Sequence, residues 1–413
     1  MSSAAAPVKA PHTSVFLILL MPFGVSSGYV GVTLAFLLAA HGMKAAAVGS
    51  LIALGVLPQT WKVLWAPVVD TTLNAKTWYV LGAFFVGLTI IAMSVIKTPM
   101  AAMPLLGALV VVSSIASTLT SMATETFMAN LDPHLQGRAS GWSQAGNFAG
   151  GGLGGGLGLV LAQHVHAQWV SGGALGLMCI ACAAPLALLT EADRTHMRPS
   201  LGATLREVLR DVWSVVRTRA GLLVIVLMLL PLGSGGASGI LVATAKEWRM
   251  SGDLVALVGG VGVGLVSIVG ALLGGYLCDL IDRRTAYCIL GCLVAPVLIV
   301  TALAPRSPLV WVASFLVYGA VIAACYAAYS AVVLEVIGRG AAATKYNFMA
   351  SVSNVPVTAM PIVDGFLHDR AGTNAMFFGE SALSIASAMM FALLVLAIRR
   401  WGPARPPTRA AQG

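Results

Sequence analysis

The sequence predicts an all-α integral membrane protein in which twelve transmembrane helices form two six-helix pseudo-repeat bundles. The composition is the first observation behind this prediction. Of the 413 residues, 58% are hydrophobic and 9% are charged, which excludes an ordinary soluble domain. The second is that apolar runs of about 20 residues, enough to cross a bilayer, recur along the whole chain. The third is a polar stretch near the middle that divides these runs into two sets of six.

The apolar runs define the expected spans. They fall at 14–40, 45–69, 78–96, 101–129, 139–162, 170–190, 220–245, 254–278, 285–304, 308–337, 345–367 and 375–398. Several are longer than a bilayer requires, so we expect helices that tilt or extend beyond the hydrocarbon. The N-terminus lacks a basic region and a convincing cleavage site, so we expect an uncleaved first helix and not a signal peptide.

Basic residues are distributed unevenly between alternate loops. A cytoplasmic N-terminus places 17 of the 24 Lys and Arg residues on the cytoplasmic side and six on the other, with Lys62 inside the membrane. The positive-inside rule therefore predicts that both termini are cytoplasmic. The net charge of +9 comes from short loops and not from one face. We accordingly expect a lipid bilayer as partner and no nucleic acid.

The polar stretch at 191–219 separates a predicted bundle at 1–190 from a second bundle, with its tail, at 220–413. One helical face of the stretch is apolar and carries Leu205, Val208, Leu209, Val212 and Val216. The other face is charged and carries Arg206, Glu207, Arg210 and Asp211. We expect an amphipathic helix on the cytoplasmic membrane surface that links the bundles, with a regulatory partner site as the alternative.

The two halves share acidic positions. Moving the first half along by 209 residues, from 70 to 279, places Asp70 on Asp279 and Glu125 beside Glu335. This common register predicts a duplicated six-span unit with parallel repeats.

Two motifs connect the chain to a known family. The pattern G-x-L-x-D-x-x-x-R-R over residues 275–284 resembles the cytoplasmic-loop signature of the major facilitator superfamily, with Asp282 where glycine is usual. The pattern K-x-x-W-A-P-x-x-D over residues 62–70 resembles the AmpG-related permeases, the peptide/acetyl-coenzyme A/drug transporter group. The segments R-A-S-G at 138–141 and A-T-K-Y at 343–346 are similar to that group as well.

The resemblance implies a secondary transporter in the bacterial inner membrane. It also implies a gating motif, for which the candidates are Asp70, Asp279, Arg283 and Arg284. Because Asp70 and Asp279 end their spans at matching positions, we expect each to help hold the cytoplasmic side closed through polar contacts. Glu335 is expected to form a local ion pair with Arg339, four residues further on.

Departures from the pattern of the AmpG-related permeases indicate which cargo to expect. Muropeptide permeases of this group commonly carry two acids four residues apart in span four, where this chain has Ser121 and Glu125. They often have two further C-terminal spans. Compact twelve-span members include siderophore permeases of the rhizobactin and pyochelin type, so the resemblance favours a ferric siderophore, with a muropeptide as the alternative.

Lys62 and Glu125 are the candidate proton-coupling pair. Counted from Asp70 and Asn130 at the polar ends of their spans, they lie about 12 Å and about 7.5 Å into the membrane, at similar depth. An ion pair would relieve the cost of burying either charge alone. The carboxyl group would then titrate with its hydration, so a conformational change would load or release a proton. A static structural pair and a snorkelling lysine are the alternatives.

The resemblance implies that spans one, four, seven and ten line the cargo cavity. Hydroxyl, aromatic and amide groups on the predicted spans would suit a medium-sized amphipathic solute, although the amides would equally suit bridges between helices. The candidate cargo residues are Ser26, Tyr29, Asn147, Tyr326, Tyr329 and Asn354.

Other chemistry is not favoured. The glycine-rich run at 150–158 lies in an apolar span without a following lysine, so we expect close helix packing, with span eight as partner, and no phosphate loop. The six cysteines lie in or beside apolar runs and are expected to pack as small apolar residues. The two histidines His164 and His166 are weak evidence for a metal site.

We therefore expect a monomer that carries a small molecule, without enzyme activity, cofactor or metal. A membrane assembly factor on the same fold is the alternative from another class, and a membrane enzyme would need a nucleophile and base that no His/Asp constellation supplies.

Overall fold

The computed structural model describes residues 12–96, 101–131, 133–167, 169–189, 201–337 and 342–401, and in these ranges the protein is helical without strands. By length and composition, nine segments of the described chain can cross a membrane. One of them, Tyr346–Ala397, lies in α17 (Ala342–Trp401) and contains the non-helical Gly372, at φ 82°. α17 therefore supplies two spans, a first arm at 342–371 and a second arm at 373–401. Residues 133–164 and the broken helix at 219–243 complete twelve spans, as the sequence predicts.

The N-terminal bundle contains the first six spans. Its first span runs through α1 (Val15–Gly28), a π-helical turn (Tyr29–Leu34) and α2 (Ala35–Ala40). The next three spans are α3 (Ala45–Thr71), α4 (Ala75–Ser94) and α5 (Met103–Ala129). The fifth runs through α6 (Pro133–Gly152), a π-helical turn (Leu153–Leu157) and α7 (Gly158–His164), and the sixth is α8 (Trp169–Ala181) with a short 3-10 turn (Ala184–Leu188).

The C-terminal bundle follows α9 (Leu201–Val216). Its first span consists of α10 (Arg219–Leu229) and α11 (Ala237–Ala243), followed by a 3-10 turn (Ala245–Trp248). The next runs through α12 (Gly252–Leu257), a π-helical turn (Val258–Gly262) and α13 (Val263–Leu280). The others are α14 (Arg283–Cys292) with α15 (Val294–Leu303), α16 (Pro308–Ile337) and the two arms of α17.

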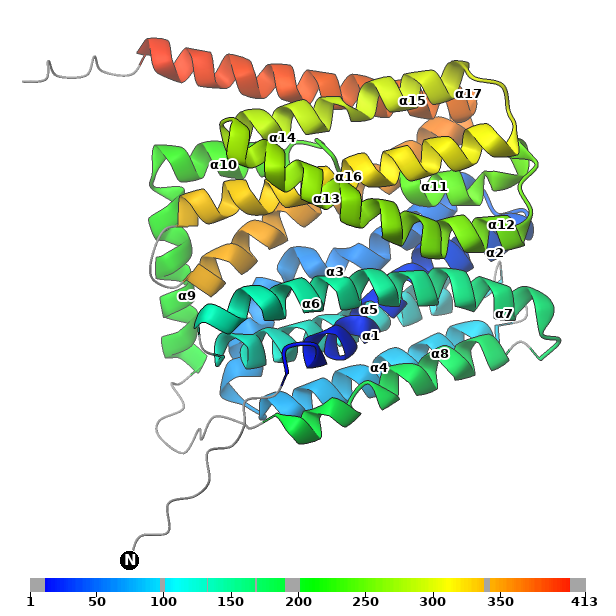
Figure 1. Ribbon diagram of the computed structural model, residues 1–413, viewed down its shortest axis with the longest axis horizontal. Helices are drawn as coiled ribbons and strands as arrows, with labels where there is room; N and C mark the ends of the chain where they lie inside the picture. Colours follow the sequence, from blue (N-terminus) through cyan, green and yellow to red (C-terminus); the bar gives the residue numbers. More distant parts are fainter. Residues whose placement is uncertain are drawn as a thin grey trace, which may run out of the picture.

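Figure 1 shows the two bundles side by side, with α9 lying across one end of the molecule. We call this end the α9 end, and the other, where α2, α7 and α12 lie, the opposite end. Leu205, Leu209 and Trp213 are exposed apolar side chains on α9, and Arg206 and Glu207 are exposed as well. The helix is therefore amphipathic, and its placement on a membrane surface stays a prediction.

Among the described residues, the buried apolar cluster that joins the two bundles lies towards one end of the molecule. One large cluster includes Val48 of α3, Ile240 of α11 and Phe377 of α17, and so extends across both bundles. A second cluster, including Val224 and Val332, belongs to the C-terminal bundle and α9. A third, including Phe16 and Tyr79, belongs to the N-terminal bundle. The bundles are thus packed together towards the opposite end and have separate cores towards the α9 end.

The glycine-rich run allows close helix contact on two sides. A Cβ at Gly146, Gly150 or Gly154 would lie within 2.3 Å of a carbonyl oxygen of α1. On the other side, a Cβ at Gly152 would lie 3.2 Å from the carbonyl oxygen of Gly260. Span eight is therefore a partner of this run, as expected, but α1 is the nearer one.

Candidate functional site

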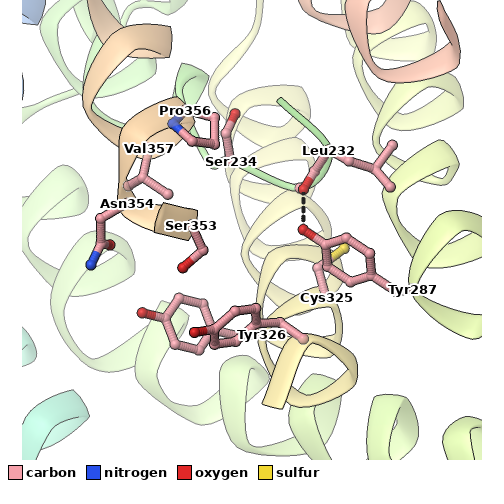
Figure 2. A pocket seen from close by; sticks show the side chains of 11 residues that line it. Leu232, Ser234, Tyr287, Cys325, Tyr326, Ser353, Asn354, Pro356 and Val357 are labelled. Atoms are coloured by element: carbon pink, nitrogen blue, oxygen red, sulfur yellow. Dashed lines mark hydrogen bonds between the residues drawn. The ribbon is translucent and has the colours of Figure 1, made fainter. Parts of the chain in front are cut away.

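A cavity in the C-terminal bundle holds three of the six candidate cargo residues (Figure 2). Its volume is about 360 Å³, including the part that is open to solvent. Four elements contribute to it: the break between α10 and α11, α14, α16 and the first arm of α17. We call it the tyrosine cavity, and its lining is Leu232, Gly233, Ser234, Tyr287, Cys325, Tyr326, Tyr329, Ser353, Asn354, Pro356 and Val357.

The break between α10 and α11 forms one wall of the tyrosine cavity. Residues 230–236 leave the helical path, and Gly233 and Gly235 have φ of 66° and 75°, values that favour glycine. The hydroxyl of Tyr287 donates to the carbonyl oxygen of Leu232 at 2.9 Å, which pins the segment to α14 (Figure 2). Non-helical backbone at membrane depth is tolerated where it lines a cavity or is buried in protein. The sequence prediction treated span seven as continuous, although the run P-L-G-S-G-G at 231–236 was a signal for the break.

Two buried hydroxyl groups of the tyrosine cavity lack hydrogen bonds within the described chain. They belong to Tyr329, with Ser353 beside it in the lining, and to Ser234 in the break. Buried polar groups are nearly always hydrogen-bonded in native proteins. These two hydroxyl groups are therefore exceptions among the polar groups that line the cavity.

Aromatic rings cover the side of the cavity that belongs to α16. Tyr326 is 55% exposed, and its ring centroid lies 5.8 Å from that of Tyr329. The ring of Tyr346 meets Tyr329 edge-on at 6.4 Å, and its hydroxyl lies 3.2 Å from that of Ser330. Tyrosine faces with polar tips suit a ligand that carries rings and hydroxyl groups.

Lys62 and Glu125 form an ion pair in the N-terminal bundle. Lys62 Nζ lies 3.7 Å from Glu125 Oε1, and the two side chains are 11% and 37% exposed. The same carboxylate oxygen accepts a hydrogen bond of 2.9 Å from the hydroxyl of Ser121, one turn earlier on α5. The serine that replaces the usual second acid therefore supports the one acid that remains. The pair leaves the carboxylate accessible to water while the lysine is almost covered.

The remaining candidate cargo residues lie away from the tyrosine cavity. Ser26 is buried, with its Oγ 2.8 Å from Ser113 Oγ on α5. Tyr29 lies in the large apolar cluster and lines a separate cavity in the N-terminal bundle, with a volume of about 720 Å³ including the part that is open to solvent. Asn147 is partly buried where its carbonyl oxygen approaches Gly24 of α1.

The candidate gating residues lie at the expected helix ends. Asp70 and Asp279 fall in the last turns of α3 and α13, but their side chains are outside the part of the chain that the structure describes. Arg283 donates to the carbonyl oxygen of Ala331 at 3.2 Å, and Arg284 pairs with Glu335 at 3.3 Å. Both arginines therefore tie α14 to α16 inside the C-terminal bundle. Glu335 thus has a partner on another helix, and the expected partner Arg339 lies outside the described residues.

Asp282, which stands where the family motif has glycine, caps α14. Its carboxylate accepts hydrogen bonds of 2.9 Å from both the backbone N–H and the hydroxyl of Thr285. Burial alone would raise the pKa of Asp282, but these bonds and the charge of Arg284 outweigh burial and lower the pKa overall. The departure from the motif therefore adds a helix cap.

Polar contacts join the two bundles at the opposite end. Asp369, at the end of the first arm of α17, accepts hydrogen bonds from the backbone N–H groups of Ala45 (3.1 Å) and Ala46 (3.0 Å), the first residues of α3. Lys246 donates to the carbonyl oxygen of Ala40 at 3.2 Å. These contacts, like the shared apolar cluster, hold the two bundles together at the opposite end.

Glu247 and His368 organise the loops beside this contact. His368 Nε2 lies 2.8 Å from Glu247 Oε1, and His368 Nδ1 lies 3.4 Å from Asp369 Oδ1. Thr373 also donates to Glu247. Burial alone would raise the pKa of Glu247, but the hydrogen bonds from His368 and Thr373 and the nearby charges outweigh burial and lower it overall.

Sequence reasoning missed two acids inside the C-terminal bundle. Asp364, on the first arm of α17, is fully buried, and Glu380, on the second arm, is 1% exposed. Both lie within predicted spans, at 345–367 and 375–398. A charge within an apolar span is the signal that singled out Lys62, and it applies equally to these two residues.

The chain is similar in structure to known transporters of small molecules. The structure of a D-xylose–proton symporter matches with a TM-score of 0.70 at 15% identity, covering 92% of this chain and 96% of the other. The nucleoside transporter NupG matches with a TM-score of 0.68 at 15% identity, covering 92% and 98%. The inward-open xylose transporter XylE from E. coli matches with a TM-score of 0.67 at 14% identity, covering 92% and 95%. These identities show a shared fold alone.

Sequence comparison identifies the family. No curated protein sequence matches the chain. The family model for the Major Facilitator Superfamily matches residues 16–242 and again residues 223–412, one match for each bundle. The protein is therefore a membrane transporter that belongs to the Major Facilitator Superfamily.

Proposed function

We propose that this transporter imports a medium-sized amphipathic solute across the bacterial inner membrane, with a ferric siderophore as cargo. The tyrosine cavity carries the proposal. It combines stacking surfaces on Tyr326 and Tyr329 with two unpartnered hydroxyl groups, and it contains no charged side chain among its lining residues. Such a site suits a weakly charged, ring-bearing solute better than a polyanion such as acetyl-coenzyme A, which calls for several basic groups.

The proposed orientation places the α9 end in the cytoplasm. It rests on the positive-inside asymmetry of the loops. In this orientation the packed opposite end faces outward, and the separate cores of the two bundles lie towards the cytoplasm. This arrangement corresponds to an inward-facing state, from which an imported solute would leave.

Proton coupling is assigned to the Lys62–Glu125 pair. Lys62 and Glu125 pair within the N-terminal bundle. Lys62 is almost fully covered, and the carboxylate of Glu125 is the more accessible of the two groups. Protonation of Glu125 would remove the attraction that holds Lys62, so proton uptake would change the packing of α3 against α5. One structural neighbour is described as a proton symporter, and this likeness of fold is an analogy in favour of coupling.

Membership in the AmpG-related group is part of the proposal. It rests on the K-x-x-W-A-P-x-x-D pattern at 62–70, and a muropeptide is accordingly the second candidate cargo. Ser121, in the place of an acid, favours the siderophore. The transporter is proposed to act as a monomer, since one chain supplies both the tyrosine cavity and the Lys62–Glu125 pair.

Growth and uptake measurements test the cargo. We expect a deletion strain to lose growth on one siderophore as sole iron source and to keep β-lactamase induction through muropeptide recycling. The reverse result would select the muropeptide.

Uptake of labelled ferric siderophore into proteoliposomes then tests the tyrosine cavity, where Tyr329→Phe should raise the KM. The exposed Tyr276→Phe on α13 is the matched control. If both variants behave as the wild type, the cavity is not the cargo site. A membrane assembly factor would show no uptake at all.

A further inference from the structure

We propose that Asp364 and Glu380 form a second proton-binding site, which the break between α10 and α11 links to the tyrosine cavity. The proposal rests on the proposed transport function but is independent of the cargo. Its ligand is a single proton. The two carboxyl groups come from the two arms of α17 and meet in the interior of the C-terminal bundle.

The two carboxyl groups have different surroundings. Glu380 Oε1 accepts a hydrogen bond of 2.5 Å from the hydroxyl of Tyr318, and Glu380 Oε2 accepts one of 3.0 Å from the backbone N–H of Ala237. Asp364 is fully buried, and neither of its oxygens meets a donor among the described residues. The two carboxyl groups lie beside consecutive residues, because a Cβ at Gly236 would lie 2.3 Å from Asp364 Oδ2 and the next residue, Ala237, donates to Glu380. Glu380 is therefore placed to be an anion, and Asp364 is placed to be a neutral acid.

Burial makes a shared proton the favourable arrangement. An ionised carboxylate without donors in a dry interior is very costly, and two adjacent carboxylates cannot both be ionised without strong repulsion. A proton on Asp364, donated to Glu380, removes one charge and gives the Asp364 hydroxyl an acceptor. Proton uptake from hydronium forms one O–H bond on Asp364 and leaves water, and release reverses this step. The pair would titrate as a unit.

The neighbouring elements supply no compensating cation in the described residues. Residues 230–236, α11 and α15 contain no titratable side chain. α3 approaches the first arm of α17 through Gly49 at Pro361 and Ala45 at Gly365. α16 contributes Tyr318, a neutral donor. The negative charge of the pair is thus balanced by protonation and not by an ion pair such as Lys62–Glu125.

The break connects the acid pair to the tyrosine cavity. Ser234 lines the cavity, and two residues further a Cβ at Gly236 would lie 2.3 Å from Asp364 Oδ2. The next residue, Ala237, donates to Glu380. Cargo that binds the Ser234 hydroxyl would shift this segment and alter the donors of Glu380. By linkage, proton binding and cargo binding would then change each other's affinity by the same factor.

Infrared titration of the purified full-length protein in lipid nanodiscs tests the site without any cargo. We expect a protonated-carboxyl C=O band at neutral pH that disappears in Asp364→Asn and persists in Glu125→Gln. Tyr318→Phe keeps both acids and should shift the band, so the test survives if Asp364→Asn fails to fold. The proposal is overturned if the band persists in Asp364→Asn or is unmoved in Tyr318→Phe. It is also overturned if sodium, compared with choline at constant pH, abolishes the band, because the pair would then be a metal-cation site.

Transport measurements separate this proposal from the proposed function. With ferric siderophore as probe, Glu380→Gln should keep counterflow exchange. Its uptake driven by an inward pH gradient should fall at least about tenfold below that of the wild type. The exposed Glu207→Gln on α9 is the control. Wild-type stimulation by the gradient in Glu380→Gln would refute the site. Absence of uptake by the wild type would refute the siderophore cargo while leaving the infrared result to decide the proton site.

Discussion

The contact between Asp369 and α3 gives the sharpest prediction for the closed end of the molecule. Asp369→Ala removes the acceptors of the first two N–H groups of α3, which have no partner inside their own helix. Loss of a helix cap costs about 0.5–2 kcal/mol, and loss of a negative charge at a helix N-terminus adds about 0.3–1 kcal/mol. Because the cap comes from the other bundle, this energy stabilises closure. A loss of about 1–2 kcal/mol should raise the population of open states about 5- to 30-fold.

Hydrogen exchange measured by mass spectrometry tests this prediction. We expect the peptide that begins at Ala45 to exchange faster in Asp369→Ala by about the same 5- to 30-fold. Asp369→Asn keeps one acceptor oxygen and should fall between the variant and the wild type. The control is Glu207→Gln, which removes an exposed carboxylate of α9 at the other end of the molecule and leaves the contacts between the bundles at the opposite end intact. Equal exchange in Asp369→Ala and the control would show that the cap does not hold the bundles together.

Further variants test the other polar contacts. Lys62→Ala should abolish the normal pH dependence of proteoliposome uptake, and Glu125→Gln should uncouple proton flux from cargo; wild-type coupling in Glu125→Gln would refute that assignment. Asp282→Gly restores the family motif but removes the cap of α14, so thermal unfolding should show a loss of about 1 kcal/mol, and an unchanged midpoint would contradict the capping role. Because the pKa of Glu247 lies below its ordinary value of 4.5, its contribution is complete above about pH 4.5 and is lost as the pH falls through the lowered pKa. Glu247→Gln should therefore flatten the fall of the unfolding midpoint at acidic pH, and an equally steep fall would argue against it.

The fold was predictable because a bilayer imposes a simple pattern. Apolar runs of about 20 residues and a polar midpoint were sufficient to predict two six-span bundles, since membrane helices must satisfy their own backbone groups. The Lys62–Glu125 pair was also predictable, because both charges lie at similar depth and each needs a partner. What could not be predicted was which buried groups meet across long sequence separations. Ser26 and Tyr326 both looked like cavity residues, yet Ser26 bonds to Ser113 and only Tyr326 reaches the tyrosine cavity. Depth along a span can be counted from the sequence, whereas the direction a side chain faces depends on helix rotation and tilt.

The first arm of α17 places three polar functions on one helix. Asn354 lines the tyrosine cavity, Asp364 belongs to the buried acid pair, and Asp369 caps α3. At a rise of about 1.5 Å per residue, these residues lie about 15 Å and about 7.5 Å apart along the helix axis. The same arm packs against α3 at backbone distance, since a Cβ at Gly49 would lie 2.0 Å from the carbonyl oxygen of Pro361. No side chain can cushion such a contact, so the arm cannot tilt against α3 without disturbing the Asp369 cap. A helix that moves as one body must then displace the cavity wall, the acid pair and the cap together, which is what coupled transport requires of its moving parts.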